Sequence, residues 1–267
     1  MQKLSFILVM ILSLQSFAGS VYDLKVNAKP LFKVFVDQGV PAAALKRTFD
    51  FIDANAGKKV KVAAKDRSNQ TKMSSKEITV RTDTIAIIDY TLPSDQNRLY
   101  VLHLKNGIVT KHHVAHGKGS GVRYATKFSN VDKTKMTSLG LYLAGSVYSG
   151  GHGASLNLHG VDKTNDQASA RDIVMHGAPY VSDDFLKRTG RLGRSWGCPA
   201  ISPILMKKMI GFLKDGGIVY AYHKDMNEMI AKGKNIQVVT TVQDDVDQDL
   251  DGEEETVRAK ASSIKRK

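Results

Sequence analysis

Three β-branched and aromatic segments that begin at Thr84 limit the fold more than any other feature of the chain. They cover residues 84–91, 98–104 and 108–115, and Asn106-Gly107 separates the last two. An Asn-Gly pair between two such runs is typical of the tight turn that joins antiparallel strands. The pattern predicts a mainly β fold with a few helices.

Two amphipathic helices are expected beside these strands, over residues 41–56 and 203–214. Pro41 suits the start of the first helix, and Ser202 is the expected N-cap of the second. Two further short apolar runs read as strands, at residues 173–175 and 218–223. Two regions are expected to lack long regular elements: the basic, polar segment 60–80 as a loop or linker, and the Gly- and Ser-rich segment 117–160 as turns at a sheet edge.

The N-terminus has the pattern of a secretory signal peptide. Lys3 precedes an apolar run over residues 4–14, and Ser16-Phe17-Ala18 fits a small-x-small cleavage site. The run is too short for a spanning helix, which needs about 20 apolar residues. We expect cleavage after Ala18, export to the periplasm or cell wall, and no transmembrane anchor afterwards; an uncleaved anchor or buried helix is the alternative.

Charge divides the C-terminus into two blocks, which are expected to stay solvated and disordered. Residues 244–255 hold eight acids and no base, and residues 256–267 hold five bases and no acid. The expected organisation is therefore a signal peptide (1–18), an N-terminal helical and loop extension (19–80), a main domain (81–225) and a charged tail (226–267).

The whole chain carries 39 Lys and Arg against 26 Asp and Glu, a formal charge of +13. Such a charge favours a polyanionic partner. The sequence contains no zinc finger, basic zipper or aromatic RNA-binding motif, so nucleic acid is not the expected partner. Acidic cell-wall polymers fit an exported protein better.

Cys198 is the only cysteine, and it stands in a Gly-rich turn ahead of the second predicted helix. A lone cysteine is commonly a small buried apolar residue. Three features favour a reactive thiolate instead: the flanking glycines and proline, the nearby Arg191 and Arg194, and the helix N-terminus that follows.

His176 ends the predicted strand at residues 173–175 and is the candidate base for this thiol. The imidazole would accept the thiol proton, and the thiolate would attack a carbonyl to form an acyl-enzyme. The backbone N–H groups of Gly197 and Cys198 are candidate donors to the oxyanion. Spacing alone is weak evidence for this pairing, since Cys and His meet in space and not in sequence.

These residues resemble the catalytic motif of the L,D-transpeptidases (YkuD-type), which remodel peptidoglycan. The resemblance rests on His176-Gly177 followed by Ser195-Trp196-Gly197-Cys198, and it is similar to a branch written Gly-Arg-Ser-Trp-Gly-Cys-Pro-Ala. Upstream stretches also resemble that branch: residues 116–121, 128–130, 138–140 and 148–156.

The resemblance implies a β-sandwich catalytic domain with a cleft, no cofactor, and a cysteine acyltransferase acting on peptidoglycan stem tetrapeptides. Either an amine or water would accept the acyl group, giving L,D-transpeptidase or L,D-carboxypeptidase activity in cell-wall biogenesis. It implies Cys198 as nucleophile, His176 as base and the Gly177 carbonyl as the group that orients the imidazole. It also suggests acylation by carbapenems.

Two departures from the family pattern concern substrate binding. Trp196 replaces the second histidine of many members, and the arginine that often follows the cysteine is absent. Candidate substrate-binding residues are therefore drawn from the motif and its surroundings: Arg171, Arg191, Arg194, Ser195, Trp196, His116 and His159.

Other readings of the same residues are weaker. His112, His113 and His116 invite a zinc site, but no acid joins them and the region reads as a strand. Ser195 fits a short nucleophile-elbow pattern without the strand–helix alternation that such an elbow requires. A non-catalytic cell-wall-binding protein is the alternative function, and a zinc amidase is a third.

Overall fold

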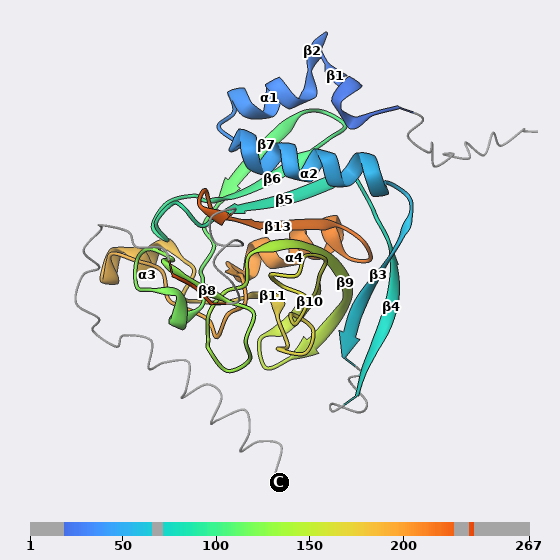
Figure 1. The fold of residues 1–267 in the computed structure, drawn as a ribbon. Helices are drawn as coiled ribbons and strands as arrows, with labels where there is room; N and C mark the ends of the chain where they lie inside the picture. The colour runs from blue at the N-terminus through green and yellow to red at the C-terminus, as the bar shows by residue number, and fades with distance from the viewer. Residues whose placement is uncertain (1–18, 66–71, 227–234, 238–267) are drawn as a thin grey trace, which may run out of the picture.

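The computed structural model describes residues 19–65, 72–226 and 235–237. In these ranges one mixed eight-stranded sheet has the order β12-β11-β10-β9-β13-β5-β6-β7, and it curls strongly (Figure 1). The strands are β5 (Thr84–Asp89), β6 (Leu99–His103), β7 (Ile108–His112), β9 (Gly140–Gly150), β10 (Gly153–Gly160), β11 (Val174–Gly177), β12 (Ala200–Ile201) and β13 (Ile218–Tyr222). The expected mainly β fold with a few helices is confirmed.

The two edges of this sheet are joined to each other by isolated backbone bridges. Ala115, which follows β7, bridges antiparallel to Ala200 of β12, and Gly117 bridges parallel to Ser195. The Ala115 N–H donates to the Ala200 carbonyl at 2.8 Å. We call residues 115–118 and 195–200 together the seam. Such closure pairs backbone groups that an open edge would leave exposed.

The hairpin of β6 and β7 and the strand β5 follow the sequence prediction. Gly107, in the turn, has a φ of +68°, a left-handed conformation that favours glycine. Every residue of β5 is buried, because β5 lies between β13 and β6 and is covered on both faces.

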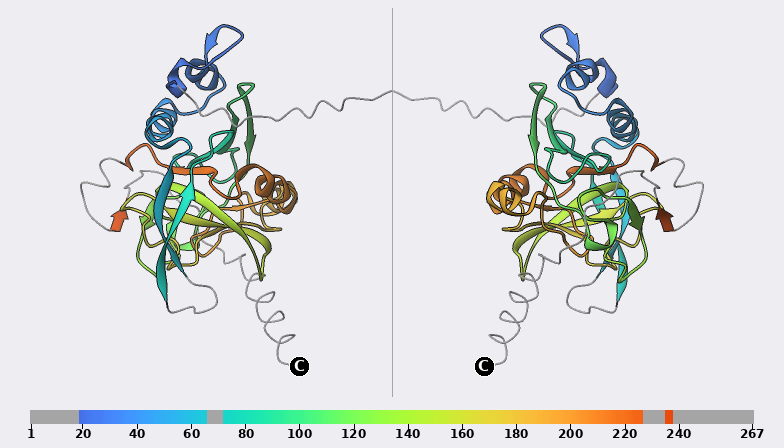
Figure 2. Two further views of the ribbon diagram at one scale, coloured as in Figure 1. Left: turned by 90° about the vertical axis from the view of Figure 1, so that its right-hand side faces the viewer. Right: turned by 90° about the vertical axis from the view of Figure 1, so that its left-hand side faces the viewer.

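Four α-helices are present in the described ranges: α1 (Leu31–Asp37), α2 (Ala42–Asn55), α3 (Asp183–Thr189) and α4 (Pro203–Leu213). The two predicted helices are confirmed as α2 and α4. Ser202 caps α4, since its Oγ accepts the Leu205 N–H at 3.3 Å. Figure 2 shows α1 and α2 stacked at one end of the molecule, with α4 on a different side of the sheet.

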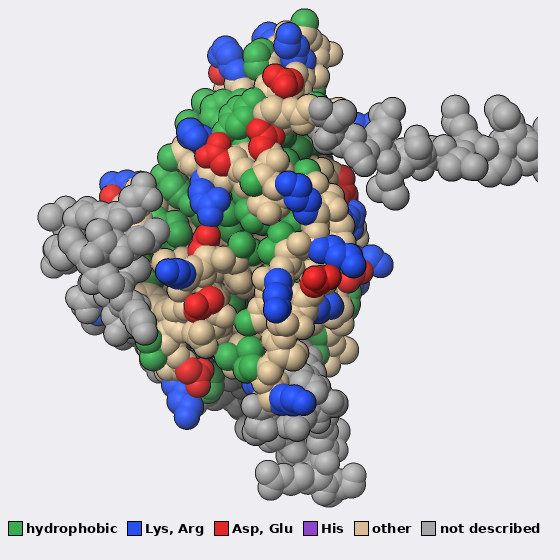
Figure 3. Space-filling model, turned by 45° about the vertical axis from the view of Figure 1, so that its right-hand side comes forward, with side chains coloured by type: hydrophobic (Ala, Val, Ile, Leu, Met, Phe, Trp, Pro, Cys, Tyr) green, Lys and Arg blue, Asp and Glu red, His purple; other side chains and the backbone are tan. Residues whose placement is uncertain are grey.

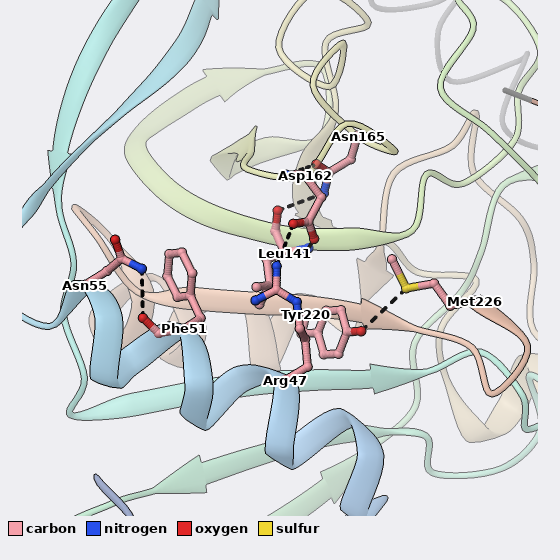
Figure 4. Close-up of polar contacts among 8 residues, drawn as sticks. All are labelled: Arg47, Phe51, Asn55, Leu141, Asp162, Asn165, Tyr220 and Met226. Carbon is pink, nitrogen blue, oxygen red and sulfur yellow. Dashed lines mark hydrogen bonds and ion pairs between the residues drawn. The ribbon is translucent and has the colours of Figure 1, made fainter. Parts of the chain in front are cut away.

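Helix α2 is tied to the sheet by a polar contact. Arg47 Nη2 lies 2.8 Å from Asp162 Oδ1, and Asp162 Oδ2 accepts the Leu141 N–H at the start of β9 at 2.7 Å (Figure 4). Asn165 Nδ2 donates to the Leu141 carbonyl at 2.8 Å. Buried Phe35, Phe49 and other side chains of the N-terminal helices belong to the same core cluster as the sheet. The N-terminal helices therefore pack against the sheet.

The prediction of a loop over residues 60–80 is wrong. Most of the described residues of this segment form a two-stranded antiparallel ribbon of β3 (Lys59–Lys65) and β4 (Met73–Thr79). Val62, Ala64 and Ile78 are buried on one side of the ribbon. Lysines alternate with apolar residues along β3. This alternation has the period of two that is typical of a strand with one covered face, but the many lysines made the segment resemble a polar loop.

The prediction of turns at a sheet edge over residues 117–160 is also wrong for its second half. Strands β9 and β10 form a long hairpin inside the sheet, and β9 pairs with both β10 and β13. The glycines mark crowded positions. A Cβ at Gly145 would lie 2.6 Å from His159 Nε2, and one at Gly160 would collide with the Asn165 carbonyl. Glycine density therefore reflects close packing here and not a loop.

The predicted signal peptide lies outside the described residues, as does the charged block after residue 243. Part of the predicted disordered tail is ordered, because β14 (Asn235–Gln237) pairs with β8 (Lys127–Ser129). Among the helices of the described segments, none has the length and apolar character needed to cross a membrane. Basic and acidic side chains are interspersed over the face shown in Figure 3.

Candidate active site

The seam positions the turn that carries Cys198. Ser195 N–H donates to the His116 carbonyl at 3.0 Å, and Lys118 N–H donates to the Ser195 carbonyl at 2.7 Å. These bonds attach the turn to the strand end on the opposite edge of the sheet. The sequence segments 116–121 and 193–200, which are far apart in the chain, are thus neighbours because the sheet closes.

Within the turn, the Ser195 side chain links two backbone groups by hydrogen bonds. Its Oγ accepts the Gly197 N–H at 3.1 Å and donates to the Cys198 carbonyl at 2.6 Å. Ser195 is 1% exposed. The structure therefore places Ser195 beneath the turn, and it gives the Gly197 N–H a partner. Gly197 N–H, one of the two backbone donors expected for an oxyanion, is therefore already hydrogen-bonded within the turn.

Glycine is required at two places where the backbones of the seam approach each other. Gly197 has a φ of +121°, and a Cβ there would lie 2.8 Å from the Met136 carbonyl oxygen. A Cβ at Gly117 would lie 2.8 Å from Gly197 Cα and would be even closer to the Lys135 carbonyl oxygen. The shape of the turn thus depends on the missing side chains.

Cys198 is partly exposed and carries a free thiol. Its Sγ accepts the Val174 N–H at 3.5 Å and lies 3.8 Å from the Asp172 carbonyl oxygen. The N–H contact suits a thiolate, whereas the carbonyl can only accept and so suits the protonated thiol, which places the sulfur between an acidic and a basic backbone group. Val174 begins β11, two residues before His176, so the sulfur lies beside the strand that holds the candidate base.

His176 lies on β11 opposite Ala200 of β12 and is 2% exposed. Its Nδ1 lies 3.1 Å from the Gly177 carbonyl oxygen. A carbonyl only accepts, so Nδ1 carries the proton, and in the neutral ring Nε2 is left as the basic nitrogen. The expected orienting contact with Gly177 is present.

A second histidine covers the ring of His176. His152, at the tip of the β9–β10 hairpin, stacks on it with ring centroids 4.2 Å apart and an angle of 26° between the planes. His152 is not among the candidate residues that the sequence motifs indicate. The only available signal was its place in the stretch 148–156, which resembles the family branch.

His116 lies in the interior, which differs from the expectation that it faces substrate. It is 0% exposed; its Nδ1 lies 2.7 Å from Arg98 Nη2 and its Nε2 lies 3.2 Å from the Gly121 carbonyl oxygen. Since Arg98 can only donate, Nδ1 accepts and Nε2–H donates to the carbonyl. Burial, together with the neighbouring Arg98, holds the pKa of His116 well below its usual value, so the ring is neutral.

Arg98 is the largest fully buried side chain of the fold, and the sequence analysis did not select it. Its guanidinium donates to the carbonyls of Val114 and Leu92 at 2.8–3.0 Å and lies 5.0 Å from the Tyr90 ring centroid. Burial lowers the pKa of Arg98 to about 10. Carbonyl dipoles, an imidazole nitrogen and an aromatic face are its direct contacts.

The three arginines expected to bind substrate make backbone contacts. Arg171 donates to the carbonyls of Ser129 and Met136 at 2.7 Å each, and to Ser138 Oγ. Arg194 donates to the Gly121 carbonyl at 3.1 Å. Arg191, also buried, donates to the Leu192 carbonyl at 2.9 Å. These contacts brace the loops around the turn.

The remaining expected residues lie on different sides of the site. His159 is buried, and its Nδ1 lies 3.0 Å from the Ala63 carbonyl oxygen, where β10 meets the ribbon. Trp196 is 46% exposed beside Cys198, and Lys135 Nζ lies 4.4 Å from the centroid of its indole. Trp196 and Lys135 therefore present an aromatic face and a cation at the surface of the turn.

The zinc alternative gains no support from the described residues. His112 Nε2 lies 2.9 Å from Thr110 Oγ1 and His113 Nδ1 lies 3.2 Å from the Gln96 carbonyl, while His116 points to the interior. Over residues 19–65, 72–226 and 235–237 there is no group of three or more His, Cys, Asp or Glu side chains arranged to hold a metal ion.

The chain is similar to solved L,D-transpeptidases. That from Xylanimonas cellulosilytica shares 15% identity, with 53% of this chain and 61% of that chain covered and a TM-score of 0.31. The Mycobacterium smegmatis enzyme shares 13% identity over 56% and 66% of the two chains, with a TM-score of 0.32. L,D-transpeptidase 1 of Mycobacterium tuberculosis shares 12% identity over the same two fractions, with a TM-score of 0.30. The chain thus spans less than two thirds of the length of these structures.

No curated protein matches the chain. The family model for the L,D-transpeptidase catalytic domain, YkuD_2, matches residues 54–222. This match covers more than half of the chain, starts at the end of α2, includes the β3–β4 ribbon and ends with β13. The protein therefore belongs to the L,D-transpeptidase catalytic domain family.

Proposed function

We propose that this protein is a peptidoglycan-remodelling cysteine acyltransferase, in the family branch with the Gly-Arg-Ser-Trp-Gly-Cys-Pro-Ala motif. One observation carries the proposal. The Cys198 sulfur is partly exposed and accepts a backbone N–H of β11, the strand on which His176 is held by the Gly177 carbonyl. A thiol with a basic nitrogen nearby on a rigid strand is the arrangement that nucleophilic acyl transfer requires.

The proposed first half-reaction forms an acyl-enzyme. The Cys198 thiol transfers its proton to Nε2 of His176, and the thiolate attacks the carbonyl carbon at the L-centre of the diamino acid in a stem tetrapeptide. The Cys198 N–H is our candidate donor to the oxyanion. The C–N bond then breaks, and the leaving D-Ala amine takes the proton from the imidazolium.

The second half-reaction regenerates the thiol. The acyl-enzyme is attacked by the amine of another stem peptide, which gives a 3→3 crosslink, or by water, which gives an L,D-carboxypeptidase. His176 accepts the proton of the attacking group and returns it to the sulfur as the thioester breaks.

Substrate binding needs a cation for the terminal carboxylate of the tetrapeptide. The inward contacts of Arg171, Arg191 and Arg194 favour a bracing role for them, whereas Lys135 lies over the exposed face of Trp196, next to the turn. We place the carboxylate contact at Lys135, with Trp196 packing against the D-Ala methyl. The basic character of the chain suits acidic cell-wall polymers as further partners.

The decisive experiment uses purified sacculi and isolated tetrapeptide muropeptides. The wild-type protein should release D-Ala or form 3→3 crosslinks, and the Cys198→Ala variant should do neither. Identical muropeptide profiles for the two proteins, together with retained binding to sacculi, would replace the enzyme by the alternative, a wall-binding protein.

We further propose that the protein acts after export, in the periplasm or cell wall. The support is the sequence of residues 1–18 alone. N-terminal sequencing of the protein from a fractionated native host should start at Gly19, and recovery of the intact N-terminus from the cytoplasm would contradict export.

A further inference from the structure

His152 and His176 form an imidazole pair that no motif of the sequence predicts. Their rings are 4.2 Å apart at the centroids and nearly parallel, at 26°. His176 is held on β11 by its own backbone, whereas His152 arrives from the tip of the β9–β10 hairpin, between Gly150 and Gly153. The stack is thus a tertiary contact between two separate elements.

The hairpin has features that aim its tip. The register of β9 and β10 shifts between Leu156 and Leu158, which leaves an irregularity at Asn157, and Asn157 Nδ2 donates to the Ser146 carbonyl across the hairpin at 3.0 Å. Such a bulge bends a strand pair and increases its twist. Gly153 has a φ of +72°, which favours glycine at this end of the turn. The bend of the hairpin, which the hydrogen bond between Asn157 and Ser146 stabilises, brings His152 to His176.

We propose that His152 is a positioning residue for His176, a role that rests on the proposed function. The Gly177 carbonyl accepts a hydrogen bond from Nδ1 and so fixes one edge of the His176 ring, and the stacked ring of His152 restricts tilting of the His176 ring about that bond. The two contacts together keep Nε2 of His176 in one orientation, as proton transfer from Cys198 requires.

The stacking also disfavours a state in which both imidazole rings are protonated. A neutral ring can stack on an imidazolium, but two imidazolium rings 4.2 Å apart repel each other. Once His152 is protonated, His176 therefore accepts the Cys198 proton less readily. The titratable groups on the elements around the pair include Tyr148, His159, Arg171, Asp172 and Cys198. Asp172 pairs with Lys65 at 2.7 Å, and Arg171 contacts carbonyls.

The experiment measures alkylation of Cys198 by iodoacetamide between pH 5 and pH 8, because this reads thiolate formation without substrate. The His152→Ala variant should react about tenfold more slowly at pH 7, as expected for loss of an aromatic stack. The His152→Phe variant keeps a ring but cannot be protonated. It should react within about threefold of wild type. On the acid side of the pH profile, the alkylation rate of this variant should fall with the uptake of one proton. The wild-type rate should fall with the uptake of two protons.

Ser149→Ala, at an exposed position of the same hairpin, is the matched control and should match wild type at every pH. Thermal melting of all variants checks that they fold. A His152→Ala rate equal to wild type, a His152→Phe variant as slow as His152→Ala, or a two-proton acid limb that persists in His152→Phe would each overturn the proposal. A parallel muropeptide assay separates the two proposals: altered alkylation without any D-Ala release rejects the proposed function and keeps the role of His152.

Discussion

The two sides of the candidate site are built in opposite ways. The turn side, which comprises Arg98, His116, Arg194 and Ser195, consists of buried polar groups that form hydrogen bonds to the backbone and to each other. The hairpin side, residues 146–154, is largely exposed, and its His152 stacks on His176. The turn that carries the proposed nucleophile is therefore fixed by buried polar contacts, whereas the hairpin meets the proposed base from the surface.

Replacing Cys198, the proposed nucleophile, should have the largest effect on activity and should leave the structure of both sides of the site intact. We expect Cys198→Ala to lower acyl transfer by at least about 10³-fold, because no other group in the turn can form the thioester. The side chain is small and partly exposed, so the melting temperature should change little. Muropeptide analysis with a thermal melt measures both, and residual turnover near the wild-type rate would rule out this cysteine.

Arg98→Met should break the turn side. The change removes donors from the carbonyls of Val114 and Leu92 and from His116, all in the interior, and should cost about 3–5 kcal/mol of unfolding free energy. Urea denaturation measures the loss. The hairpin variant Ser149→Ala, in comparison, should stay within about 0.5 kcal/mol. Equal losses in the two variants would contradict the contrast between the sides.

Acid should destabilise the fold through two buried histidines, His116 on the turn side and His223, which follows β13. Burial lowers the pKa of His223 to about 4, and the pKa of His116 is also well below 6.5. As pH falls from about 6.5 toward 4, the unfolded chain binds protons that the folded chain does not, so stability falls. For His223 the expected loss is up to about 3 kcal/mol.

Melting temperatures between pH 7.5 and pH 4.5 test this dependence. The variant His223→Gln should lose part of the acid sensitivity and keep the part that His116 supplies. A melting temperature that does not change over this range would show that neither histidine is held neutral.

Gly117→Ala should cost about 1–3 kcal/mol and lower the rate of acyl transfer, since the added methyl would push the Gly197 backbone away from its position. Gly151→Ala on the hairpin is the matched control, because nothing lies within 4 Å of the added Cβ. Melts and alkylation of Cys198 would detect the difference. A Gly117→Ala variant with the melting temperature and alkylation rate of wild type would show that the seam accommodates the added methyl group.

The smallest expected effect is on substrate binding. Lys135→Gln should raise KM for tetrapeptide about tenfold with little change in kcat, because the lost charge contacts the bound carboxylate and not the reacting atoms. Lys133→Gln, in the same loop, is the control. A fall in kcat at unchanged KM would assign Lys135 to another step.

Local patterns were enough to predict the elements that depend on neighbours in sequence. The helices α2 and α4 follow from periodicity and caps, and the β6–β7 hairpin follows from Asn106-Gly107. The contact between His176 and the Gly177 carbonyl was implied by the family resemblance and is present. These features involve residues that lie close together in the chain.

What the sequence did not reveal depends on tertiary packing. Gly145 and Gly160 read as turn residues, but they are glycines because His159 and Asn165 occupy the space of a side chain. An arginine such as Arg98 is usually exposed, and nothing in its sequence neighbourhood indicates burial. His152 reaches His176 only through the bend of a hairpin, which no residue pattern of the segment specifies.

We expect the proposed activation of the Cys198 thiol to come late in folding, because it depends on the seam. Residues Ala115 and Ala200 meet only when the opposite edges of the sheet join, and contacts between such distant segments form slowly. Before they join, we expect Cys198 to react like the thiol of an unfolded chain. Trp196, the sole tryptophan, lies within the seam, so its fluorescence should change in step with the gain of alkylation during refolding. A reactive sulfur ahead of the fluorescence change would show that activation precedes closure.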